Sequence, residues 1–166
     1  DLEKLNMHIR NIAVLGETGS PVLSCYINNE AGRSAYRDVI DSRIKEIRRS
    51  LSLSQRLDFE RALARIEEYL ASEIKPGSKG VVIFSRSGDS PFFQALQFRL
   101  PLPTQLLMDS VPHIYEVVML KDTYHRYVVL ISTESFARIV EVSVGDVTAD
   151  LWAESPELRK RVGREW

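Results

Sequence analysis

Two consecutive apolar stripes at helical spacing constrain the fold of this chain more than any other feature. One recurs every three or four residues from Tyr36 to Leu51, and the other does so from Phe59 to Ile74. Each stripe covers a single face, so each helix must bury that face against another element. Between them, Ser52 precedes Gln55 by the three residues of a capping box. The sequence therefore predicts a helical hairpin, about 36–51 and 55–74.

Apolar segments around the hairpin are typical of the strands on which it could pack. "VLSCYIN", "GVVIFS" and the alternating "FFQALQFRL" read as strands, and "LLMDS" could add another. An earlier helix is expected over residues 2–12. Asp109 or Ser110 could cap a later helix that has Pro112 in its first turn and carries Ile114, Val117, Val118 and Leu120. This order predicts an α/β fold, in which the hairpin packs on a mixed, mostly antiparallel sheet.

The last part of the sequence reads as the start of another unit. After a linker, "KDTYHR", the segment "YVVLISTESFARIVEV" is apolar and β-branched, as strands packed on a core are. We therefore predict a first α/β domain at residues 1–120. Residues 121–166 would carry the first strands of a second α/β domain, truncated in this sequence.

The charge balance excludes functions that depend on overall basicity. The chain has 22 Lys and Arg against 23 Asp and Glu, so only a local patch could bind nucleic acid, and no DNA partner is expected. The single cysteine, Cys25, lies in an apolar run and has no disulfide partner, which favours a core residue in a reducing compartment. No segment approaches the roughly 20 apolar residues of a membrane helix. We expect a cytoplasmic protein without a membrane partner.

No assembled catalytic or metal site is evident. The three histidines lack metal-ligand spacing, and there is no cysteine cluster. "GETGS" lacks the lysine of a phosphate-binding loop, and "FSRSGDSPF" lacks the pattern of a nucleophile elbow. We expect no enzyme activity from the chain as given, and neither metal nor cofactor.

Basic residues gather on and beside the first helix of the predicted hairpin. Such a face could contact phosphate groups. Acidic residues are interleaved with them, so a solvated face held by ion pairs is the alternative. A second basic run, at 159–164, allows the same two interpretations. The candidate RNA- or ribosome-binding residues are Arg33, Arg37, Lys45, Arg48, Arg49 and Arg56.

A family resemblance rests on the order of several segments: "VLSCYIN", the Arg-rich helix, the hairpin, "KPGSKGVVIFS", "FRLPLPTQLLMDSVPHIYEVVML" and "YVVLISTESFARIVEV". This order resembles the first domain and domain junction of the class-one release factors of archaea and eukaryotes, relatives of Pelota. It more closely resembles the bacterial archaeo-eukaryotic release-factor-like proteins. The resemblance implies an α/β sandwich that enters the ribosomal decoding site. It also implies a central domain whose Gly-Gly-Gln loop reaches the peptidyl-tRNA ester.

Two motifs of stop-codon readers are altered here. Their Asn-Ile-Lys-Ser corner is replaced by "SLSLS", and their Tyr-x-Cys-Asp-x-x-Phe-His motif aligns with "LLMDSVPH". Asp109 and His113 fit that motif, but Leu106 and Met108 lack the polar groups that read base edges. No Gly-Gly-Gln occurs, and by the family's layout that loop would lie at or beyond "VGREW". Whether such a loop could hydrolyse the ester stays open.

The leading functional hypothesis is therefore a ribosome-associated, translation-factor-like protein, acting in rescue, hibernation or atypical termination. Its first domain would dock on ribosomal RNA without reading a codon. The alternative is a protein-interaction or regulatory module unrelated to the ribosome. A continuous basic face would favour the first hypothesis, and an evenly mixed surface would favour the second.

Overall fold

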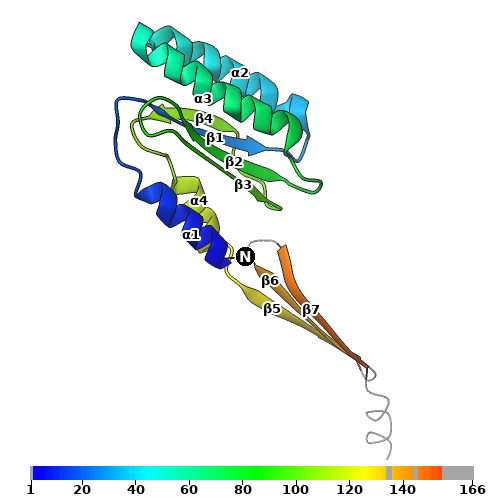
Figure 1. Ribbon diagram of the computed structural model, residues 1–166. Coiled ribbons are helices and arrows are strands. Elements are labelled where there is room, and N and C mark those ends of the chain that lie inside the picture. The colour runs from blue at the N-terminus through cyan, green and yellow to red at the C-terminus, as the bar shows by residue number, and fades with distance from the viewer. Residues whose placement is uncertain (1, 134–135, 144–145, 155–166) are drawn as a thin grey trace, which may run out of the picture.

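The computed structural model describes residues 2–133, 136–143 and 146–154. These residues form a four-stranded sheet covered by helices and a separate three-stranded sheet (Figure 1). The basic run at 159–164 and the segment "VGREW" lie outside the described residues. The predicted α/β class is confirmed.

The first sheet contains the strands that the apolar runs predicted. Its order is β3-β2-β1-β4, and each of its pairings is antiparallel. The two central strands are buried along almost their whole length, as their mostly apolar sequences favour. The strands are β1 (Val22–Asn28), β2 (Gly80–Arg86), β3 (Phe92–Phe98) and β4 (Gln105–Asp109).

The predicted hairpin covers one face of this sheet. It consists of α2 (Arg33–Ser50) and α3 (Leu53–Ser72), and the capping box at Ser52 and Gln55 is present. Ile47 and Ile66 are buried together with Leu23 and Cys25 of β1. The two apolar stripes therefore form one core with the sheet, as the sequence predicted.

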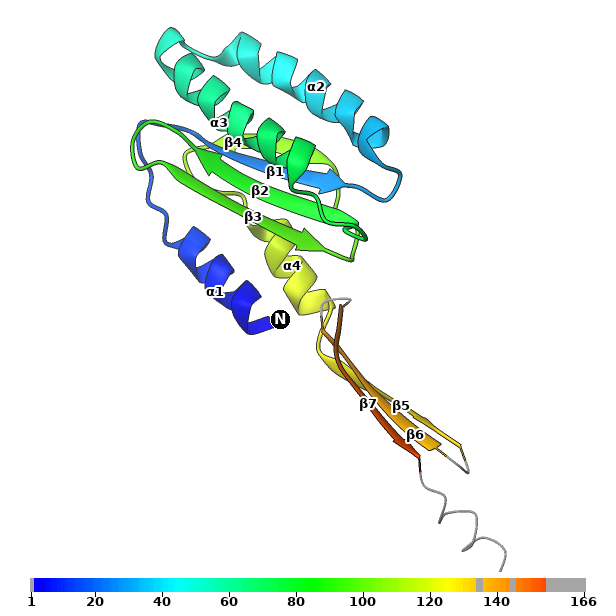
Figure 2. The ribbon, with the colours of Figure 1, turned by 45° about the vertical axis from the view of Figure 1, so that its right-hand side comes forward.

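Two further helices cover the opposite face. They are α1 (Leu2–Ala13) and α4 (Tyr115–Thr123), and Figure 2 shows them on the side of the sheet away from the hairpin. Tyr26, Val82 and Phe84 point to this side and share a second core with Leu5 and Val117. Because side chains alternate along β1 and β2, one pair of strands supports both cores.

The start of α4 differs from the prediction. The helix begins at Tyr115, Ile114 occupies the N-cap position, and no side chain caps it. The prediction that Asp109 or Ser110 caps this helix is therefore wrong. The carboxylate of Asp109 instead accepts the backbone N–H of Ser110 and contacts the His113 ring. The carboxylate of Asp109 is therefore hydrogen-bonded within a local turn and does not cap the helix.

A buried arginine holds two loops at one end of the first sheet. The side chain of Arg86 is almost fully buried, with 2% of the residue exposed. Its Nε donates to the Ser90 carbonyl and its Nη1 to the Gly16 carbonyl, both at 2.9 Å. The loop after α1 is therefore joined to the turn between β2 and β3 through the end of β2.

The second sheet extends away from the helices as an antiparallel ribbon (Figures 1 and 2). It consists of β5 (Tyr127–Ser132), β6 (Phe136–Ser143) and β7 (Asp146–Glu154). Every residue of β5 is exposed, including five consecutive large apolar side chains from Tyr127 to Ile131. Because α4 runs on to Thr123, the helical part ends a few residues after the predicted boundary. The division at residue 120 stays a prediction.

None of the described helices is both long and apolar enough to cross a membrane.

Candidate nucleic-acid interface

Arg37 stands inside a network of ion pairs between the two hairpin helices. Its guanidinium lies 3.0 Å from the carboxylate of Asp41 on the same helix and 2.9 Å from Glu67 on α3. The hydrogen bond to Glu67 and the charges of both acids raise the pKa of Arg37 above its ordinary value. Arg37 therefore links α2 to α3, and the two carboxylates neutralise its charge.

Arg48 is engaged in the same way nearer the corner. Its Nε and Nη2 each donate to one oxygen of Glu60 at 2.7 Å, which is bidentate geometry. This hydrogen bonding lowers the pKa of the Glu60 carboxyl. Arg48 is exposed and lies away from the buried stripe of α2. The sequence analysis did not predict that Arg48 reaches across to α3.

We expect the Arg48–Glu60 pair to contribute about 0.2–1 kcal/mol to folding, because both side chains remain partly exposed. A double-mutant cycle with Arg48→Ala and Glu60→Ala, followed by urea unfolding, measures this coupling. The folded state lowers the pKa of Glu60. The coupling should therefore be complete at neutral pH and disappear as the pH falls through that lowered value. A coupling that persists after Glu60 is protonated would contradict this assignment.

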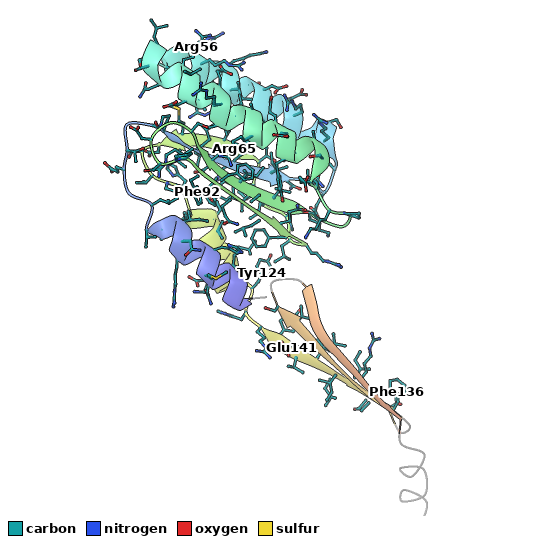
Figure 3. All side chains as sticks on the ribbon, viewed as in Figure 1. Arg56, Arg65, Phe92, Tyr124, Phe136 and Glu141 are labelled. Carbon is teal, nitrogen blue, oxygen red and sulfur yellow. The ribbon has the colours of Figure 1, made fainter. Side chains whose placement is uncertain are left out.

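Three of the predicted cations remain available near the corner. Lys45, Arg49 and Arg56 are exposed and form no ion pair within the described part of the chain. The nearby acid Glu46 is paired with Arg43 at 2.8 Å. Residues 42–61 carry six basic and three acidic side chains, so this end of the hairpin is positive although the whole chain is not. Figure 3 shows Arg56 at the outer end of the hairpin.

Arg33 does not belong to this corner. It begins α2, whereas Arg49 lies in the last turn. Sixteen residues of α-helix separate their backbones by about 24 Å. The six predicted residues therefore do not form one continuous basic face. Arg37 and Arg48 form ion pairs that link the two helices, and Arg33 lies at the far end of α2. The other three residues lie near the corner.

Two leucines at the corner were not predicted as site residues. Leu53 is 89% exposed and Leu57 is 57% exposed. They lie one turn apart in α3, so they share a face beside Arg56. Leu53 lies in "SLSLS", where alternation with serine resembles a strand more than a helix start, and Leu57 follows it by one helical turn, which is why the exposed pair was not recognised. The corner thus combines positive charge with apolar surface.

The segment that resembles an altered decoding motif occupies β4 and the loop after it. Leu106 is 1% exposed and belongs to the core beneath the hairpin, and Met108 packs against the same core. They lie opposite Cys25 and Leu23 in the β1–β4 ladder. Both side chains are used in packing and do not project from the surface as base-reading groups must.

Asp109 and His113 form a pair at the end of this strand. The ring Nε2 of His113 lies 3.1 Å from the Asp109 carboxylate. The Ser110 backbone N–H, and then His113, lower the pKa of Asp109. The backbone N–H of His113 donates to the Ser24 hydroxyl at 3.0 Å, and its carbonyl accepts the Tyr26 hydroxyl. These contacts fasten the loop before α4 onto β1.

The described residues hold no reactive cysteine and no candidate metal cluster. Cys25 is fully buried, and burial raises the pKa of its thiol to about 12. A thiol in that environment is protonated at neutral pH and does not act as a nucleophile. Among residues that the structure describes, no group of three His, Cys, Asp or Glu side chains could hold a metal ion.

Comparison with known proteins identifies the fold. No protein-family model matches the sequence, and neither does a curated protein. The solved structure of an archaeal translation termination factor, aRF1, aligns with 98% of this chain at a TM-score of 0.56 and 15% identity. A structure described only as an archaeal protein aligns with 95% of this chain at a TM-score of 0.56 and 17% identity. The chain therefore has a fold like that of this archaeal release factor.

The alignments cover only part of the solved proteins. This chain spans 47% of the length of the termination factor and 46% of the length of the second archaeal structure.

Proposed function

We propose that this chain belongs to a ribosome-associated, translation-factor-like protein that acts in rescue, hibernation or atypical termination. The observation that carries the proposal is the structural likeness to aRF1, which extends over 98% of the chain and so includes both sheets. The finer assignment, to the bacterial relatives of archaeal and eukaryotic release factors, is part of the same proposal. So is a cytoplasmic location, because ribosomes work there.

The hairpin corner is the surface that we assign to ribosomal RNA. Lys45, Arg49 and Arg56 are exposed cations that form no ion pair within the described part of the chain, and such cations bind phosphates by releasing counterions. Arg37 and Arg48 hold the two helices together and so present the corner. Arg33 lies at the other end of α2, so any contact that it makes with RNA would be separate from the corner.

Docking would proceed without reading a stop codon. The positions that align with the base-reading tyrosine and cysteine are Leu106 and Met108, and both pack in the core. The proposal gives the described residues a binding role and no catalytic step.

The test is co-sedimentation with ribosomes over a series of salt concentrations. Arg49→Ala with Arg56→Ala should weaken binding. It should also reduce the slope of log affinity against log salt by about 0.7–0.9 for each phosphate that the variant no longer binds. The matched control is Arg10→Ala with Lys121→Ala, which removes the same charge from α1 and α4 on the opposite layer. Equal weakening in both variants, or none in either, would refute the corner as the docking surface.

A protein-interaction module is the second candidate, and the exposed leucines favour it. Leu53 and Leu57 offer apolar surface that phosphates cannot use. In the same experiment, Leu53→Ser with Leu57→Ser distinguishes the two candidates. If binding is insensitive to salt and is abolished in the leucine variant, the partner is a protein surface.

A further inference from the structure

The start of α3 has few packing contacts of its own. Every residue from 52 to 57 is exposed, and Phe59 is the first buried residue after them. This exposed segment carries Arg56, Leu53 and Leu57 of the hairpin corner. Helix ends with so little packing fray easily. The contacts directly behind residue 57 therefore decide how firmly the corner is held.

One such contact joins α3 to the loops beneath it. The Ser20 hydroxyl donates to the carboxylate of Asp58 at 2.6 Å, and it accepts the backbone N–H of Asp89 at 2.9 Å. Ser20 is 3% exposed, so water has little access to this hydroxyl. A hydrogen bond to an ionised carboxylate is also stronger than one between neutral groups. A single hydroxyl thus connects α3 with the loop after α1 and the turn between β2 and β3.

The backbone that carries Ser20 is itself fixed. The Thr18 hydroxyl donates to the Ser20 carbonyl at 3.1 Å and accepts the Ser20 backbone N–H at 3.2 Å. Arg86 joins the same two loops through the carbonyls of Gly16 and Ser90. The Ser20 hydroxyl is therefore held in place before it meets α3.

Gly88 provides the space that this arrangement needs. Its φ is +85°, and a Cβ at this position would overlap the Ser20 hydroxyl and the Asp58 carboxylate. Glycine adopts this φ at no steric cost and leaves both groups room to approach each other. A side chain at position 88 would force Ser20 and Asp58 apart.

A different contact restrains α3 from the other side. Arg48 of α2 binds Glu60, which follows Asp58 by two residues. Two residues correspond to a rotation of about 200° around an α-helix, so the two acids point in nearly opposite directions. The ion pair of Glu60 is partly exposed, whereas the Ser20 hydroxyl that binds Asp58 belongs to a buried residue. The second helix of the hairpin is thus held both by α2 and by the Ser20 loop.

We propose that Ser20, acting through Asp58, positions the hairpin corner for docking on RNA, an inference that rests on the proposed function. With the hydrogen bond intact, the start of α3 is ordered before RNA arrives, and Arg56 is held at a fixed place beside Arg49. Without it, this segment must be ordered during binding, which costs affinity. Ser20 contacts no RNA itself.

Ser20→Ala tests the proposal in the co-sedimentation experiment, because it removes the hydroxyl without changing any charge. We expect ribosome binding to weaken by about threefold to tenfold, the usual cost of ordering one side chain or a short segment on association. That cost does not involve counterions. The loss should therefore be the same at every salt concentration, and the slope of log affinity against log salt should remain that of the wild type. Arg49→Ala with Arg56→Ala lowers the slope, so the two effects are separable.

Amide hydrogen exchange of the free chain is the second readout. In Ser20→Ala, the amides of residues 56–60 should exchange at least about threefold faster than in the wild type, because the start of α3 opens more often. The amides of α4, on the opposite layer, should exchange at the wild-type rate. A general loss of stability would accelerate both regions.

Ser78→Ala is the matched control. Ser78 is 8% exposed, and its hydroxyl donates to the Gly80 carbonyl at the other end of β2. This variant should leave both ribosome binding and exchange at residues 56–60 unchanged. Thermal melts identify which variants are folded. If Ser20→Ala does not fold, Gly88→Ala provides an independent variant, since its Cβ separates Ser20 from Asp58 without altering charge.

Three outcomes would overturn the positioning role of Ser20. One is a folded Ser20→Ala chain that binds ribosomes like the wild type, and another is unchanged exchange at residues 56–60. The third is a slope that falls as it does in the double arginine variant, because the hydroxyl would then support phosphate contacts directly. If the wild type does not co-sediment with ribosomes, the proposed function fails, whereas the exchange measurement still decides whether Ser20 orders the corner.

Discussion

Replacing Ile66 with alanine is expected to lower the free energy of unfolding by about 2–5 kcal/mol. Ile66 is 1% exposed and lies in the core that α2 and α3 share with β1 and β2. Truncation removes buried methyl and methylene groups and leaves a cavity that the surrounding strands cannot close. Ile47→Ala on the facing stripe of α2 should cost a similar amount. Urea unfolding with a common m-value provides the measurement.

Lys45→Ala is the matched control on α2. Its side chain is exposed and has no ion-pair partner in the described chain, so stability should change by no more than about 0.5 kcal/mol. If all three variants lose equal stability, the hairpin is not packed as described.

Replacing Arg86 with alanine is expected to destabilise the fold by about 2–4 kcal/mol. The carbonyls of Gly16 and Ser90 both lose a charged donor, and the void lies at the end of a buried strand. Thermal or urea unfolding should show the loss, and it should be accompanied by faster amide exchange in the two loops that Arg86 joins.

Arg86→Met separates hydrogen bonding from packing. Methionine fills much of the volume of the arginine stem but donates nothing to the two carbonyls. It should therefore recover only a minor part of the stability lost in Arg86→Ala. Full recovery by methionine would mean that the volume of Arg86, and not its hydrogen bonds, supports this end of the sheet.

Helices and strands were predicted well from the sequence where apolar residues recur at helical spacing or follow one another in long segments. The hairpin and its capping box, as well as β1 and β2, follow from local spacing and from long apolar runs. The start of α4 did not follow. Asp109 has the chemistry of a cap, but the Ser110 backbone and His113 compete for its carboxylate. Local propensity cannot decide between a cap and a turn when both satisfy the same oxygen.

The candidate interface was predicted less completely, because its ion pairs join residues of different helices. Spacing along α2 identifies Arg37 and Arg48 as polar-face residues. Their partners Glu67 and Glu60 lie 30 and 12 residues further along the chain. An antiparallel hairpin centred near Ser52 brings such pairs together. The alignment of the two helices in that hairpin was needed to predict the ion pairs, and spacing along one helix does not provide it.

The second sheet has a practical consequence for work on this stretch as an isolated polypeptide. Among the residues that the structure describes, strand β5 pairs only with β6, and its apolar side chains from Tyr127 to Ile131 are all exposed. An uncovered edge of that kind is a template for strand addition by any unfolded or neighbouring chain. The main hazard during expression and storage is therefore self-association through β5, even when the helical sandwich is fully folded. A single lysine in place of Val129, next to the free edge, is the least invasive way to discourage it.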